Sequence, residues 1–108
     1  MKFELDHIGV AVESLSDGRK FYEALGLGKM SMERVEGEKV TVGMFELAND
    51  SRIELLEPTT PDSPVGKFLK SRGPGIHHIC LKVGDIRATL KALKSQGVQL
   101  INEEPRQG

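Results

Sequence analysis

The chain has 108 residues, of which 38% are hydrophobic and 29% charged, which fits one folded domain and excludes a disordered chain. Fifteen Lys and Arg against sixteen Asp and Glu give a net charge of -1, so the charge balance predicts no nucleic-acid or membrane partner. The apolar stretches are far shorter than the roughly 20 residues that span a bilayer. We therefore expect a cytoplasmic protein.

The first half of the sequence has the pattern of a strand, a helix and three further strands. Residues 3–12 alternate with the period of a strand, and Ile8, Val10 and Val12 form its apolar face. A helix follows and ends at Gly26, where a C-terminal glycine is typical. The three short strands are predicted over residues 29–35, 40–47 and 52–57.

After residue 57 a proline-rich linker begins, and the strand and helix pattern then starts again. Ser63 and Pro64 predict a short helix within this linker. A strand follows over residues 76–83, and a further helix ends at Gly97. We divide the single domain into a first module, residues 1–58, a linker with a short helix, residues 59–75, and a second module, residues 76–108.

The two halves match under a constant shift of 71 residues, which pairs His7 with His78 and Gly26 with Gly97. Under this shift the last three strands would recur between about 100 and 128, beyond the end of the sequence at Gly108. Residues 98–101 are predicted to begin the first of them. We therefore expect an α+β fold of paired βαβββ modules, the second truncated after its helix and first following strand.

Strand alternation places three potential metal ligands away from the helices. His7 lies opposite the apolar face of its strand, and His78 occupies the equivalent position in the repeat. Glu54 lies opposite Ile53 and Leu55. Two imidazoles and a carboxylate suit zinc, cobalt, manganese, iron or nickel. The alternative is that these are half-buried polar side chains with local partners.

The strand over residues 76–83 carries two more side chains of chemical interest. Its apolar face is predicted to consist of Ile79, Leu81 and Val83, which leaves His77 on the helix side. Cys80, the single cysteine, faces the other way, and we interpret it as a small buried hydrophobe rather than a nucleophile.

Four stretches of the sequence carry a family resemblance. They are Leu-Asp-His-Ile-Gly-Val-Ala-Val at 5–12, Phe-Tyr at 21–22 with Leu-Gly-Leu at 25–27, Arg-Ile-Glu-Leu-Leu-Glu-Pro at 52–58, and Gly-Ile-His-His-Ile-Cys at 75–80. Together they resemble the methylmalonyl-CoA epimerases of the vicinal oxygen chelate superfamily, to which glyoxalase I also belongs. The resemblance covers essentially the whole chain.

The resemblance implies sheets that curl around a divalent metal, with cobalt preferred and manganese, zinc or nickel as alternatives. His7, Glu54 and His78 match three of the family's ligand positions. The fourth ligand is a glutamate on the final strand, which falls beyond Gly108 and also resembles one of the two proton-transfer bases. The place of the other base is near Val42, so no catalytic residue is assigned within these 108 residues.

The resemblance implies an isomerase that interconverts the R and S forms of methylmalonyl-CoA at the alpha carbon, through a metal-stabilised enolate. The alternatives are a glyoxalase I-type lyase and a non-catalytic small-molecule-binding protein of the same fold. An acyl-CoA partner and a homodimer are expected. We also expect the 108-residue chain to be less stable than one extended by roughly 20 to 30 residues and to show little or no epimerase activity.

Overall fold

Strands and helices follow one another in the order that the sequence predicts. The structure is a computed structural model that describes residues 3–101. Its elements are β1 (Phe3–Ala11), α1 (Leu15–Ala24), β2 (Ser31–Val35), the 3-10 turn η1 (Glu36–Glu38), β3 (Val40–Glu46), the 3-10 turn η2 (Ala48–Asp50), β4 (Arg52–Pro58), α2 (Pro64–Arg72), β5 (Gly75–Val83) and α3 (Ile86–Ser95). Within residues 3–101 no helix is long and apolar enough to cross a membrane.

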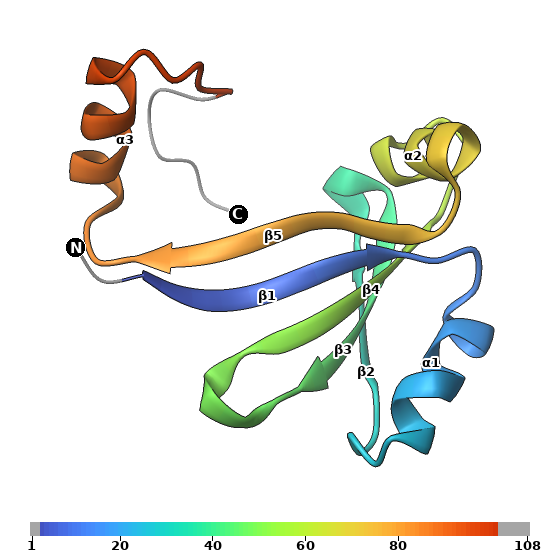
Figure 1. The fold of residues 1–108 in the computed structure, drawn as a ribbon. Coiled ribbons are helices and arrows are strands. Elements are labelled where there is room, and N and C mark those ends of the chain that lie inside the picture. Colours follow the sequence, from blue (N-terminus) through green and yellow to red (C-terminus); the bar gives the residue numbers. More distant parts are fainter. Residues whose placement is uncertain (1–2, 102–108) are drawn as a thin grey trace. The chain divides into compact units, whose positions relative to one another are not determined.

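Residues 5–80 form one compact unit, and residues 3–4 with 81–101 belong to a second. The first unit holds the sheet, whose strand order is β2-β3-β4-β1-β5. β2, β3 and β4 pair in antiparallel fashion, whereas β1 pairs in parallel with β4. β1 therefore lies between β4 and β5, and its direction is opposite to that of β5 (Figure 1).

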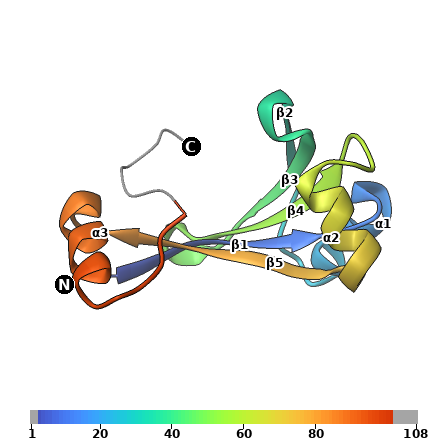
Figure 2. The ribbon, with the colours of Figure 1, turned by 90° about the horizontal axis from the view of Figure 1, so that it is seen from above.

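The two faces of this sheet are covered by different helices near the end of β1 (Figure 2). On one face, Val10 and Val12 pack with Leu15 and Tyr22 of α1, as the strand alternation predicts. On the other face, Ala11 packs with Val65 of α2. Because successive strand residues point to opposite faces, His7 and Gly9 share the face of Ala11.

The register of β1 and β4 extends this alternation to the next strand. Gly9 lies opposite Glu54, and Val10 lies opposite Leu55, which is fully buried on the α1 side. Glu57 also points to the α1 side, where its Oε1 accepts a 2.8 Å hydrogen bond from the backbone N–H of Leu15. Glu54 is thus on the face opposite α1, as predicted.

α1 and α3 share their length, their type of N-cap and a glycine after the C-terminal end. α1 and α3 each have ten residues, and their N-caps, Ser14 and Asp85, accept a hydrogen bond from the backbone three residues further on. Gly26 and Gly97 follow their C-terminal ends with φ angles of 89° and 81°, values that favour glycine. The same shift of 71 residues relates His7 and His78.

Two expectations for the second half are wrong. Ile79 and Leu81, predicted to form the helix-facing apolar side of their strand, are 60% and 56% exposed. Residues 98–101, predicted to begin a strand, form none. A strand needs a hydrogen-bonded partner, and no described strand pairs with this segment.

Candidate functional site

The two repeated histidines meet side by side on the sheet face opposite α1. His7 comes from the middle of β1 and His78 from β5, and their Nε2 atoms lie 3.0 Å apart. The rings are nearly perpendicular, with centroids 5.1 Å apart. The side chain of His7 is only 14% exposed, so this ring is largely shielded from water.

Gly9 makes this approach possible because it leaves the space that the His78 ring occupies. A Cβ atom built on Gly9 would overlap the ring, lying 2.7 Å from Nδ1 and 2.8 Å from Nε2. Since Gly9 faces Glu54 on β4, the ring of His78 is also brought beside β4. The side chains of His7, His78 and Glu54 therefore gather on one patch of the sheet.

The far nitrogen of each imidazole has its own partner. His7 Nδ1 lies 2.8 Å from Oδ2 of Asp6, and because a carboxylate only accepts, Nδ1 carries the proton. His78 Nδ1 lies 2.9 Å from Nδ1 of His77, whose ring packs against Phe68 of α2. With His7 neutral, this network requires His78 to donate from Nε2 and His77 to donate to His78.

Glu54 is held by an arginine that sequence analysis did not select. Arg52 donates to Oε2 of Glu54 from Nε at 3.1 Å and from NH2 at 2.9 Å. The same NH2 group donates to Oδ2 of Asp6 at 3.0 Å. Glu54 Oε2 lies 3.6 Å from Nδ1 of His7, so this carboxylate stands at the Asp6 side of the His7 ring rather than between the two Nε2 atoms.

The electrostatics of the patch favour neutral imidazole at His78 and ionised carboxylate at Asp6. Burial, followed by the nearby His7 and His77, lowers the pKa of His78. The hydrogen bond from His7 lowers the pKa of Asp6, and the Arg52 charge acts in the same direction. The hydrogen bonds to Glu54 in turn raise the pKa of Arg52. The neutral His78 imidazole is the form that binds a metal, and the ionised Asp6 can accept the proton of His7 Nδ1.

A second group of potential ligand atoms shares His7. Asp6, His7 and Cys80 each place one such atom within 4.8 Å of the others. This set is less suited to a cation because two of its members, Asp6 and His7, are already hydrogen-bonded to each other through Nδ1 of His7. Burial also raises the pKa of the Cys80 thiol, and the charges of Asp6 and Glu54 raise it further, which disfavours the thiolate that binds metals.

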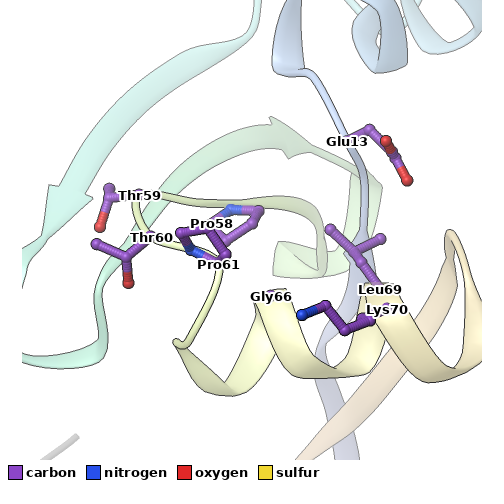
Figure 3. A pocket seen from close by; sticks show the side chains of 8 residues that line it. All are labelled: Glu13, Pro58, Thr59, Thr60, Pro61, Gly66, Leu69 and Lys70. Carbon is purple, nitrogen blue, oxygen red and sulfur yellow. The ribbon is translucent and has the colours of Figure 1, made fainter.

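A hollow of about 400 Å³ lies elsewhere in the same unit, between the loop after β4 and the helix α2 (Figure 3). Its lining residues are Glu13, Pro58, Thr59, Thr60, Pro61, Gly66, Leu69 and Lys70. None of the candidate ligands lines it. The histidine pair therefore remains the centre of the candidate site.

Sequence analysis placed His7, Glu54 and His78 on one face but missed the residues that hold them. Arg52 precedes Glu54 by two residues on the same strand, and this spacing could have indicated a shared face. Asp6 is adjacent to His7, and its contact could not be inferred from alternation. At the expected place of a base, Val42 is 7% exposed and packs in the apolar core.

Fold and sequence comparison agree on the class of protein. The chain belongs to the glyoxalase/bleomycin resistance protein/dioxygenase superfamily, whose family model matches residues 6–108. It is 50% identical over 105 residues to the uncharacterized protein YqjC of Bacillus subtilis (strain 168), covering 96% of this chain and 74% of that one.

Methylmalonyl-CoA epimerases are among its relatives and structural neighbours. The mitochondrial methylmalonyl-CoA epimerase of Bos taurus is 34% identical over 106 residues, and the match covers 96% of this chain but only 60% of the bovine one. A structure of a methylmalonyl-CoA epimerase in complex with methylmalonyl-CoA and NH4+ superposes with a TM-score of 0.85 at 34% identity, covering 100% of this chain and 79% of the other.

Proposed function

We propose that His7, His78 and Glu54 hold a divalent cation, cobalt first among the candidates. The distance between the two Nε2 atoms, 3.0 Å, carries this proposal. Metal–nitrogen bonds of about 2.1 Å at angles between 90° and tetrahedral separate neighbouring ligands by roughly 3.0–3.4 Å. Both hydrogen bonds from Arg52 to Glu54 end on Oε2, which leaves Oε1 as the oxygen for the cation.

Cation binding would reverse the direction of the hydrogen bond between His78 and His77. Both Nε2 atoms must then present lone pairs, so the proton of His78 must lie on Nδ1. There it can be donated to Nδ1 of His77, at the observed distance of 2.9 Å. His7 needs no such change, because Asp6 already holds its proton on Nδ1.

For the whole protein we propose epimerisation of methylmalonyl-CoA at the alpha carbon, supported by the related epimerases and by this donor set. A general base takes the proton from the alpha carbon, the electron pair of the broken C–H bond moves onto the thioester oxygen, and a general acid on the opposite face returns a proton. A bound divalent cation supplies positive charge to that oxygen as the charge develops. The aligned histidines and Glu54 contribute the rigid, partly buried ligand set.

A cobalt-binding titration tests the ligand assignment. His7→Ala and His78→Ala should each weaken Co²⁺ binding by at least tenfold, because each removes one nitrogen ligand. Cys80→Ser is the matched control, since Cys80 is adjacent to the site but outside the proposed set. Equal affinity in all four proteins would contradict the assignment, and a loss confined to His7→Ala and Cys80→Ser would favour the Asp6, His7 and Cys80 group.

Isotope exchange tests the proposed reaction, with the whole protein as the enzyme. In heavy water, deuterium should enter the alpha position of methylmalonyl-CoA in a cobalt-dependent manner and without net loss of substrate. NMR follows the exchange directly. An absence of exchange, together with turnover of methylglyoxal hemithioacetal, would replace the epimerase proposal with a glyoxalase I-type lyase.

We also propose the two-module organisation, with residues 1–58 and 76–108 as the modules and 59–75 as the linker, together with a cytoplasmic homodimer. The matching caps and C-terminal glycines of α1 and α3 support the two modules. Light scattering of the purified protein tests the dimer, and a monomeric mass would exclude it.

A further inference from the structure

We infer that Arg52 is a positioning residue of the metal site, acting through Asp6 on His7 and directly on Glu54. This inference rests on the proposed function, because it concerns how the same ligands are oriented. None of the contacts requires Arg52 to touch the cation or the substrate.

The geometry joins both carboxylates through one guanidinium group. Arg52 lies opposite His7 in the register of β1 and β4, so its side chain emerges on the site face. Its NH2 group donates to Asp6 and to Glu54, while Nε gives a second bond to Glu54. Because the guanidinium is planar and rigid, fixing one carboxylate fixes the other relative to it.

Asp6 then determines the tautomer of His7, and the anchored Glu54 determines where its own free oxygen lies. Asp6, held by Arg52, accepts the Nδ1 proton of His7 and thereby directs the Nε2 lone pair toward His78. Glu54 is anchored through Oε2, which restricts where Oε1 can lie. Such hydrogen-bonded partners behind metal ligands commonly change metal affinity by 10–100-fold when they are removed.

A purely electrostatic role for Arg52 makes the opposite prediction. The guanidinium carries a positive charge beside a site proposed for a cation, so its removal would strengthen cation binding if only Coulomb repulsion mattered. The sign of the affinity change therefore separates the two roles.

The experiment compares Arg52→Met, Arg52→Lys and the wild type by Co²⁺ titration and by ¹⁵N NMR of the imidazoles in metal-free protein. Arg34→Met is the matched control, because Arg34 is a 62% exposed strand residue paired with Glu36 outside the site. We expect about 10–100-fold weaker Co²⁺ binding in Arg52→Met and an intermediate loss in Arg52→Lys. The NMR spectrum should show His7 shifting from the Nδ1–H toward the Nε2–H tautomer in Arg52→Met.

Unchanged or tighter Co²⁺ binding in Arg52→Met, or a His7 tautomer that stays on Nδ1, would overturn the inference. If Arg52→Met does not fold, Arg52→Lys gives the same two readouts with the charge retained. The two failures can be told apart. If His7→Ala binds Co²⁺ as tightly as the wild type, the proposed metal site is wrong, whatever Arg52 does. Even then, the tautomer measurement decides whether Arg52 positions His7 through Asp6.

Discussion

Replacing Gly9 by Ala should displace His78 while leaving every proposed ligand in the sequence. The added Cβ would overlap Cε1 of His78 and lie 2.7 Å from Nδ1, whereas ordinary contact begins at 3.4 Å, so the ring must retreat by more than about 0.7 Å. Overpacking of this kind costs about 1–3 kcal/mol of folding free energy. The retreat also separates the two Nε2 atoms, and we expect Co²⁺ affinity to fall by about 10–100-fold.

A double-mutant cycle with His78→Ala measures whether the ring is the cause. In wild type the Gly9→Ala substitution should destabilise the protein to urea, and in the His78→Ala background it should cost much less, because the ring is absent. Gly37→Ala is the control, since a Cβ there meets nothing within 4 Å. The same cost in both backgrounds, or unchanged Co²⁺ affinity in Gly9→Ala, would refute the placement of His78 over Gly9.

The remaining predictions concern stability. Burial lowers the pKa of His78 in the folded state. As the pH falls below about 6.5, His78 is therefore protonated in the unfolded chain before it is protonated in the folded one. Metal-free protein should lose stability from that pH down to the folded-state pKa. Urea midpoints at pH 7.5 and 5.5 should therefore differ more in wild type than in His78→Gln; equal differences would contradict this. Glu57→Ala removes the acceptor of the Leu15 N–H and should cost about 0.5–2 kcal/mol in urea unfolding while Co²⁺ affinity is retained.

The sequence was sufficient for the elements that depend on local pattern. Alternation placed Val10 and Val12 against α1 and placed Glu54 on the opposite face, because a strand has a period of two residues and one helix covers one face. The helix ends were equally predictable, since Ser63, Asp85 and Gly97 have side chains or backbone angles that suit those positions.

Contacts that depend on which strands are neighbours were not predictable in this way. Arg52 reaches Asp6 only because β1 and β4 pair in parallel, with residues 46 positions apart in the chain brought within 3.0 Å. Alternation likewise put His77 on the opposite face from His78, yet the two Nδ1 atoms lie 2.9 Å apart. The alternation of a strand predicts the direction of each Cα–Cβ bond. It does not predict the rotamer of a long or planar side chain.

The strand direction bears on how the two histidines of the proposed repeat meet. β1 and β5 are neighbours that run in opposite directions (Figure 1). In an antiparallel pair, moving one residue forward on one strand corresponds to moving one backward on the other. Two copies of one strand paired in this way can therefore bring equivalent positions together at only one place along their length. In this chain the side chains of His7 and His78, 71 residues apart, meet with their Nε2 atoms 3.0 Å apart and supply both imidazoles of the candidate metal site.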